Sequence, residues 1–242
     1  QHMVKQAFAD GELTQKLFLT SANSINVARW LPQQFYYLFA FRQWFGKNDP
    51  PVICVPSGNF GNICAGLLAH RSGMPVSKFV AACNANAVVP EFMQTGEYLP
   101  KQAVATLSNA MDVGNPSNFV RVLELFDKEF DSLKNVLTSY SISDNETKKA
   151  IGDVYTKYNY LLDPHGAVGY VSLEKYLSHH PLQKGFILET AHPVKFYDVV
   201  ESVIHEKVPV PPSIQMLLHK EKSSIKMNAD YSFLKEYLLA KK

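Results

Sequence analysis

The chain has 242 residues, of which 46% are hydrophobic, and a formal net charge of +2. That length supports one large hydrophobic core or two smaller ones, and the near-neutral charge gives no electrostatic footprint for a nucleic-acid partner. The most aromatic run, 35–41, is too short to cross a bilayer, and the three cysteines (Cys54, Cys64 and Cys83) lack C-x-x-C or zinc-site spacing. We therefore expect a cytoplasmic protein with buried free thiols, no membrane or nucleic-acid partner and no metal site.

The N-terminal part of the chain predicts a helix, a strand and a second helix. The expected elements are a short helix over 3–8, an apolar strand over 17–20, a polar loop over 21–26 and an amphipathic helix from about 26 to 45. Six apolar side chains of the second helix recur mostly at three- and four-residue spacing, which predicts that they form its buried face. They are Val27, Leu31, Phe35, Leu38, Phe39 and Phe41.

The stretch from Val52 to Asn62 organises the rest of the chain. Val52 to Val55 is a β-branched, apolar run that predicts a buried strand, and Pro56 ends it because proline has no N–H to donate. A polar, glycine-containing loop over 57–62 then leads into a helix over 63–72. A strand, a glycine loop and a helix N-terminus together can bind phosphate. Neither the nucleotide P-loop nor the dinucleotide fingerprint matches, so an ordinary strand-to-helix turn stays the alternative.

The downstream pattern predicts an α/β fold. A strand over 77–83 follows the helix, so strands and helices alternate, and we expect an open, mainly parallel, twisted sheet flanked by helices. Ser143 with Glu146 resembles a capping box, and Asp163 with Pro164 is a typical helix start. The further elements expected are a strand over 185–190 and helices over 119–130, 147–158, 163–179, 196–204 and about 231–239.

Polar clusters follow the expected strands, where parallel α/β sheets bind ligands. They are 21–26, 57–62, 84–86 and 190–192. Each could be only a turn, but four of them at one sheet edge favour a site for a polar small molecule. His165 and His192 each lie beside a proline, where a structural role is the more frequent one. Arg29 suits either an anion or a surface salt bridge.

Four segments together resemble the threonine synthases, pyridoxal-phosphate enzymes of fold type II. They are 19–29 (LTSANSINVAR), 55–62 (VPSGNFGN), 109–118 (NAMDVGNPSN) and 188–196 (LETAHPVKF), and 163–168 (DPHGAV) is similar too. The resemblance covers nearly the whole chain. We interpret 1–242 as one partial enzyme domain with its phosphate loop within about 52–75 and a helical and extended tail over about 206–242.

The resemblance implies that O-phosphohomoserine and water give threonine and phosphate, and that pyridoxal 5'-phosphate is the cofactor. It implies that the cofactor phosphate is wrapped by Gly58, Asn59, Phe60, Gly61 and Asn62. Thr190 would hydrogen-bond the pyridine nitrogen, where a neutral hydroxyl does not enforce a protonated ring. The residues expected near the substrate phosphate are Ser21, Asn23, Ser24, Asn26 and Arg29.

The chain departs from the family in one respect. The family anchors its cofactor on a lysine in a Ser-Phe-Lys-Asp-like segment, and no lysine here has that context. We therefore expect these residues to be the C-terminal half to two-thirds of an enzyme, a monomer or homodimer, with no catalytic residue of their own and no activity alone. Two alternatives stay open: a phospho-lyase relative that forms a 2-oxo acid and ammonia, and a non-catalytic phosphate-binding module.

Overall fold

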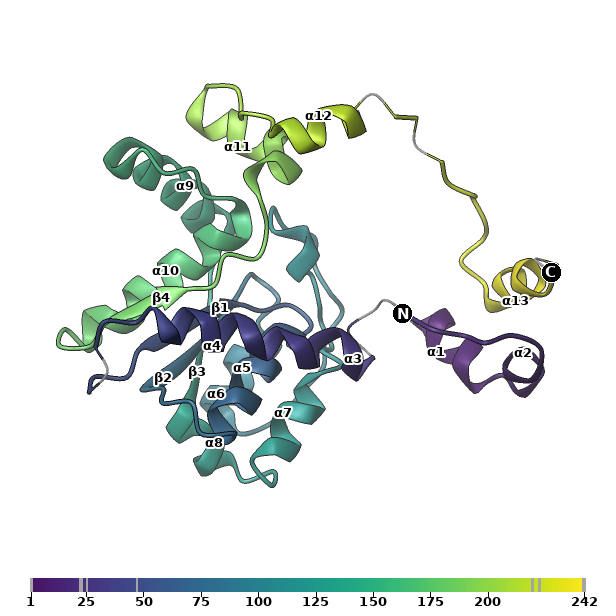
Figure 1. Cartoon of the computed structure of the whole chain (residues 1–242), viewed down its shortest axis with the longest axis horizontal. Coiled ribbons are helices and arrows are strands. Elements are labelled where there is room, and N and C mark those ends of the chain that lie inside the picture. The colour runs from purple at the N-terminus through teal and green to yellow at the C-terminus, as the bar shows by residue number, and fades with distance from the viewer. Residues whose placement is uncertain are drawn as a thin grey trace. The chain divides into compact units, whose positions relative to one another are not determined.

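The computed structural model describes residues 2–21, 24, 26–46, 48–218, 220–221 and 223–240 (Figure 1). It divides into two compact units, one formed by 23–209 and the other by the chain ends, 1–22 and 210–242. Asn23, one of the expected substrate residues, lies outside the described residues. Among the residues described, no helix is both long and apolar enough to span a membrane.

The larger unit is built on a parallel sheet with the strand order β3-β2-β1-β4. The strands are β1 (Val52–Pro56), β2 (Lys78–Cys83), β3 (Leu137–Ser141) and β4 (Gly185–Ile187). β1 pairs with β2 from Val52↔Lys78 to Pro56↔Ala82, and with β4 from Val52↔Gly185 to Cys54↔Ile187. Since all pairs are parallel, the carboxyl ends of the strands share one edge, and the loop after β1 lies near the middle of it.

Helices cover both faces of this sheet, as expected for an open α/β fold (Figure 1). Those of the larger unit are α3 (Val27–Trp30), α4 (Gln34–Arg42), α5 (Gly61–Arg71), α6 (Val88–Thr95), α7 (Phe119–Leu125), α8 (Phe130–Val136), α9 (Asp144–Tyr158), α10 (Pro164–His179) and α11 (Tyr197–Ile204). Short 3₁₀ segments are η1 (Leu31–Gln33), η2 (Asn109–Met111) and η3 (Pro193–Phe196). The capping box at Ser143 and the start at Asp163 and Pro164 are confirmed.

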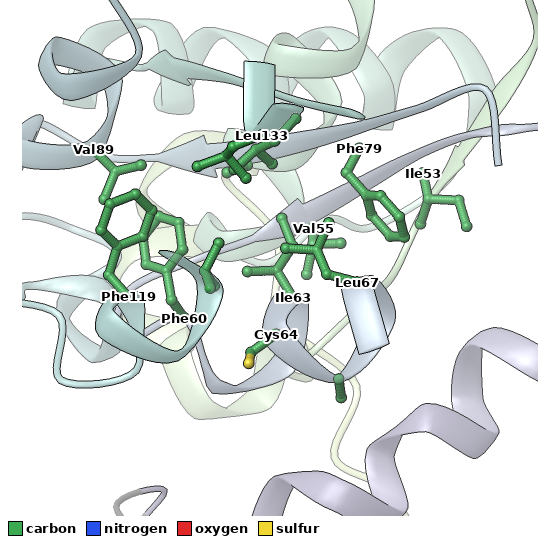
Figure 2. Close-up of a cluster of buried hydrophobic side chains, with 14 of the residues drawn as sticks. Ile53, Val55, Phe60, Ile63, Cys64, Leu67, Phe79, Val89, Phe119 and Leu133 are labelled. Carbon is green, nitrogen blue, oxygen red and sulfur yellow. The ribbon is translucent and has the colours of Figure 1, made fainter. Parts of the chain in front are cut away.

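Alternation along β1 divides the core between the two faces. Ile53 and Val55 point to the layer that contains α5, while Val52 and Cys54 join the cluster with Val168 of α10. Figure 2 shows Val55 beside Ile63 and Leu67 of α5, and Ile53 beside Phe79 of β2. The run from Val52 to Val55 is entirely buried because both faces of a parallel sheet are covered. The three cysteines are free and buried, as expected.

The sequence prediction fails at two places in the first third of the chain. Residues 17–20 form no strand, and Phe18 is fully exposed, so the predicted strand at the start of the fold is wrong. The fourth strand of the sheet is β3, which the sequence analysis did not predict because its residues mix apolar and polar side chains. The helix predicted over 26–45 is interrupted at Pro32, where the chain narrows to the 3₁₀ turn η1, and it ends at Arg42.

The prediction of which face of that helix is buried is also wrong. Trp30 and Tyr37 are the buried residues of α3 and α4, and the Tyr37 hydroxyl donates to the Asn62 carbonyl oxygen at 2.6 Å. Phe41 packs partly against the core, but the other five side chains assigned to the buried face are exposed: Val27, Leu31, Phe35, Leu38 and Phe39. The helix is therefore apolar on two sides, and periodicity alone identified the wrong one.

The smaller unit contains α1 (His2–Ala9), α2 (Gly11–Lys16), α12 (Pro212–Leu218) and α13 (Tyr231–Ala240). α1 ends at Ala9, and the carboxylate of Asp10 caps α2 by accepting from Glu12 N and Leu13 N. The Tyr231 hydroxyl donates to Asp10 at 2.6 Å, and the Lys235 ammonium lies 2.9 Å from both Asp10 and Glu12. Polar contacts thus join the two chain ends.

Candidate functional site

The loop from Ser57 to Asn62 connects the carboxyl end of β1 to the N-terminus of α5. Phe60 adopts a left-handed backbone (φ 62°), and its ring is buried 5.3 Å from that of Phe119. Figure 2 shows the two rings side by side in the core. Gly58 lies against the turn over 109–111, so an added Cβ would come within 2.7 Å of Met111 Cα. A side chain at 58 would therefore displace backbone, which explains the glycine.

The backbone N–H groups of residues 58–62 have no acceptor among the described parts of the protein. The neighbouring donors are all satisfied: Ser57 N donates to the Ala82 carbonyl, Ile63 N to Asn62 Oδ1, and Cys64 N to the Phe60 carbonyl. Five successive free donors at the start of an eleven-residue helix form an anion-binding concavity, reinforced by the helix dipole.

The asparagine side chains of the loop hold its shape. Asn59 Nδ2 donates to Ser24 Oγ at 2.7 Å, and Asn59 Oδ1 accepts from the backbone N and the hydroxyl of Ser117 at 2.7 and 3.0 Å. Asn62 Nδ2 donates to the Pro56 carbonyl at 2.7 Å. The side-chain amides of Asn59 and Asn62 thus both hydrogen-bond to other parts of the protein. What these residues can offer an anion is their backbone N–H, which sequence reasoning did not distinguish from their side chains.

A cavity of about 240 Å³ opens in front of this loop. Its walls bring together three of the four expected clusters, since Ser24, the whole of 58–62 and Thr190 all line it. The fourth cluster does not reach it. Asn84 and Asn86 instead form a buried network with Thr106, Ser108 and Asp112, so their role is to close the loops after β2.

Asn26 and Arg29, two further residues expected near the substrate phosphate, are not among the residues that line the cavity. Asn26 caps α3 by accepting from Ala28 N at 3.0 Å. Arg29 is exposed on α3 and is absent from the cavity wall, and Ser21 belongs to the smaller unit. Of the described residues expected near the substrate phosphate over 21–29, Ser24 is the one that lines the cavity.

Sequence reasoning missed four residues of the site. Gln33, Met111 and Lys195 line the cavity, and Arg121 donates to the Ser24 carbonyl at 3.4 Å and to Asn118 Oδ1. Lys195 and His165 are the members of that wall that can carry positive charge. Lys195 could have been found, because it lies within the 188–196 segment already singled out. Gln33 and Arg121 have no local sequence signal.

Two interacting carboxyl groups lie behind the cavity, one on the buried Asp163 and one on Glu189, a residue that is exposed overall. Asp163 is fully buried, and its Oδ1 accepts from the backbone N of His165 at 2.8 Å and contacts His165 Nδ1 at 2.9 Å. These contacts lower the pKa of Asp163 despite the cost of burial. The carboxyl of Glu189, which packs over Gly166, has its pKa raised to about 9 by burial and by the Asp163 carboxylate. A protonated Glu189 can donate to Asp163 Oδ2, which otherwise has no partner among the described residues.

The two histidines differ. His192 is exposed, and its Nδ1 accepts from Val194 N at 3.2 Å, which caps η3 in the structural role expected. His165 is buried against the Phe196 ring and lines the cavity, and within the described chain its Nε2 has no hydrogen-bond partner. His165 therefore has a free polar atom beside the cavity and is held by Asp163 on the other side of its ring.

A larger cavity, about 520 Å³, lies between α9 and α10. Its charged side chains are paired within one helix, as in Lys149 with Asp153 of α9, or across the two helices, as in Glu146 of α9 with Lys175 of α10. It has no free backbone donors of the kind found at 58–62. Chemistry, more than size, therefore favours the smaller cavity as the functional site.

Residues 3–189 match the family model described as pyridoxal-phosphate dependent enzyme. This chain belongs to that family. A second model, threonine synthase, C-terminal, matches 166–238. The loop and the helix N-terminus therefore lie within the match to the pyridoxal-phosphate enzyme family, and Thr190 lies within the match to the second model. The expected fold class, a mainly parallel sheet flanked by helices, is confirmed.

Several threonine synthases are similar to this chain. The threonine synthase of Haemophilus influenzae is 44% identical over 99% of this chain and 56% of its own length. The crystal structure of threonine synthase from Escherichia coli superposes with a TM-score of 0.93 at 40% identity, covering 100% of this chain and 56% of that one. A pyridoxal-phosphate-bound threonine synthase from Brucella melitensis gives a TM-score of 0.86 at 28% identity. The chain thus spans little more than half the length of these relatives.

Proposed function

We propose that this chain is the cofactor-cradling part of a threonine synthase, which converts O-phosphohomoserine and water to threonine and phosphate. The observation that carries the proposal is the row of free N–H groups over 58–62, opposite Thr190, in a chain whose full length aligns with threonine synthases. A phosphate dianion needs several preorganised donors, and this loop offers five at a helix N-terminus.

The residues present fit pyridoxal 5'-phosphate at its phosphate end. The backbone N–H groups of Gly58, Asn59, Phe60, Gly61 and Asn62 would bind the phosphate oxygens, with Phe60 anchoring the loop in the core. Thr190 would hydrogen-bond the ring nitrogen from the other wall. When bound, the cofactor supplies an electron sink for the reacting amino acid. A neutral hydroxyl at 190 leaves the protonation of that nitrogen unforced.

The substrate would occupy the open side of the same cavity. Ser24 and Gln33 lie on one wall, and Lys195 offers a cation for an acidic group of the substrate. Asn26 and Arg29 stay candidates for the substrate phosphate only if α3 moves toward the cavity, and Ser21 and Asn23 stay candidates on the sequence resemblance alone. We further propose a cytoplasmic enzyme that is a monomer or homodimer.

These 242 residues contain no lysine in the family's anchoring context, so we propose that the chain alone binds the cofactor weakly and is inactive. Adding pyridoxal phosphate and recording the absorbance of bound cofactor tests this directly. Tight binding that borohydride makes irreversible would contradict it, and mass spectrometry would then identify the lysine, with Lys195 the first to examine.

The assignment of the reaction is tested on the complete gene product that contains these residues. It is supplied with pyridoxal phosphate and O-phosphohomoserine, and threonine and inorganic phosphate are quantified together. Equal amounts of both support threonine synthase. Phosphate accompanied by a 2-oxo acid and ammonia supports the phospho-lyase alternative. If neither set of products forms, the non-catalytic alternative replaces both.

A further inference from the structure

One buried nitrogen beside the cavity lacks a partner in the described part of the chain. His165 lies in the first turn of α10, is 4% exposed and lines the cavity, and no described residue hydrogen-bonds to its Nε2. Burial of an unpaired polar atom costs free energy, and buried polar atoms of folded proteins nearly always have a partner. An unpaired nitrogen in the wall of a cavity is therefore suited to bind the molecule that fills the cavity.

Two contacts hold the His165 ring in place. Asp163 Oδ1 lies 2.9 Å from Nδ1 and also accepts from the backbone N of His165 at 2.8 Å. The ring of Phe196, which is itself buried, packs against the imidazole with a centroid distance of 4.8 Å and an angle of 67° between the planes. A polar contact and an aromatic contact thus restrict rotation of the ring, and neither of them uses Nε2.

The Asp163 carboxylate decides which nitrogen of His165 carries the proton. Although burial opposes it, the hydrogen bonds from His165 lower the pKa of Asp163, and Glu189, with its pKa raised to about 9, is the protonated partner of the two carboxyl groups. An ionised carboxylate has no proton to donate, so Nδ1 is the donor in the contact with Asp163. In the neutral ring Nε2 then keeps its lone pair, and it is an acceptor.

The cavity wall therefore has two parts of opposite hydrogen-bonding character. The backbone N–H groups of 58–62 are donors, and His165 Nε2 is an acceptor. Lys195, the other residue of the wall that can carry positive charge, has donors only. Because both parts line one cavity of about 240 Å³, a small molecule bound there can reach both. Such a molecule needs an anionic group at one end and an N–H or O–H group at the other.

We propose that His165 Nε2 is a ligand-binding atom of this cavity, which accepts a hydrogen bond from an N–H or O–H group of the phosphate monoester held at 58–62. The inference rests on the proposed function for the place of the phosphate, and it holds whichever reaction follows. Two molecules of that proposal carry both groups: the cofactor has a ring hydroxyl, and O-phosphohomoserine has an amine. The experiment below distinguishes these two sources of the donor.

Nitrogen-15 NMR of the histidine rings in the unchanged chain at pH 8 tests the proposal. The His165 signals are identified by the contacts of its ring protons with Phe196. Without ligand we expect a proton on Nδ1 and none on Nε2. Pyridoxamine 5'-phosphate, which cannot form an imine with a lysine, and O-phosphohomoserine are then titrated separately. At least one of them should shift the Nε2 signal toward that of a protonated nitrogen, and inorganic phosphate should not.

Two substitutions of His165 separate the two sides of its ring. The amide of His165→Asn reproduces the donor toward Asp163 but places no atom where Nε2 lies. We expect this variant to bind the monoester that shifts Nε2 about tenfold more weakly, and inorganic phosphate with unchanged affinity. His165→Gln, whose longer side chain brings an acceptor nearer the cavity, should recover part of the loss. His179→Asn, at the exposed end of the same helix, is the matched control and should change neither affinity.

Other results overturn the proposal. A proton on Nε2 in the ligand-free chain would make this atom a donor. An Nε2 signal that neither monoester shifts, in a chain that still binds inorganic phosphate, would mean that the phosphate site is present and His165 does not contact its ligand. Equal weakening of phosphate and monoester binding by His165→Asn would mean that the ring only supports the loop over 58–62. If no phosphate compound binds at all, the proposed cofactor site is wrong, and this inference fails with it.

Discussion

The two sides of the sheet differ in the number of residue pairs that join their strands and in how well the adjoining loops are buried. Around β2 and β3, five register pairs join the strands, and the loops beyond them are tied by buried amides and carboxylates. Around β4, three pairs join the strand to β1, and the residues that follow it are exposed. The side with β2 and β3, the closed side, holds the loop over 57–62 in place, and the side with β4, the open side, leaves the cavity accessible. Substitutions on the two sides should therefore affect stability and binding in different proportions.

The largest effect is expected at Asn84 on the closed side. This residue is 1% exposed, and its Nδ2 donates to Thr106 Oγ1 and Asp112 Oδ1, both at 2.8 Å. Asn84→Leu removes these donors and leaves buried acceptors unsatisfied, so we expect a loss of about 3 kcal/mol in the free energy of unfolding. Urea denaturation measures it, with Asn135→Ala on the surface as the control. A change below about 1 kcal/mol would show that the network is not needed to close this side.

Gly58 tests the boundary between the two sides. Gly58→Ala places a Cβ 2.7 Å from Met111 Cα, so the loop must shift, and we expect a loss of about 2 kcal/mol together with about tenfold weaker binding of pyridoxal phosphate. Gly152→Ala in α9 is the matched control, because its Cβ would meet the side chain of Val203 in α11 at an ordinary 3.5 Å. That substitution should stabilise the protein by about 0.5–1 kcal/mol. Equal effects at both positions would refute the close-approach argument.

Glu189 tests the open side by its pH dependence. Its folded pKa of about 9 lies above the ordinary value, so between pH 5 and 9 the folded state holds a proton that the unfolded state has lost. The contribution of Glu189 to the free energy of unfolding is therefore complete below the pKa of the unfolded state, and it declines as the pH rises toward the folded pKa of about 9. Since residue 189 is exposed, solvent screens the pair, and we expect Glu189→Gln to flatten that decline by only about 1 kcal/mol.

Denaturation midpoints of both proteins at pH 6 and pH 9 measure this difference. Glu236→Gln, in α13 of the smaller unit, is the control and should leave the slope unchanged. An identical slope for the parent chain and Glu189→Gln would show that Asp163 and Glu189 do not share a proton.

The smallest effect is expected at Lys195, an exposed cation on the cavity wall. Lys195→Ala should weaken binding of inorganic phosphate by about threefold at low salt and by less at high salt, because solvent and ions screen an exposed charge. Titration calorimetry at two ionic strengths measures this. Lys207→Ala, whose ammonium pairs with Glu201, is the control. A loss that does not shrink with salt would indicate a direct, desolvated contact.

Local chemistry made much of the site predictable. The β-branched run before Pro56, the loop over 57–62 and the caps at Ser143 and Asp163 all form as the sequence indicated, because each depends on neighbours within a few residues. The strand over 17–20 failed because an apolar run becomes a strand only where a partner strand is available. The buried face of the helix over 26–45 was predicted wrongly because both of its sides are apolar, and periodicity cannot choose between them.

The sequence by itself determined the class of the fold, the position of the glycine-containing loop over 57–62 and the family to which the chain belongs. Tertiary structure alone decided that the asparagine side chains of the loop bind protein while its N–H groups stay free, that Lys195 and Gln33 reach the cavity and Arg29 does not, and that the side bearing β4 is open. The physical reason is the distance along the chain over which each feature is decided. Caps, turns and strand ends are set by adjacent residues, whereas hydrogen bonding and exposure of a side chain depend on which distant segments contact it.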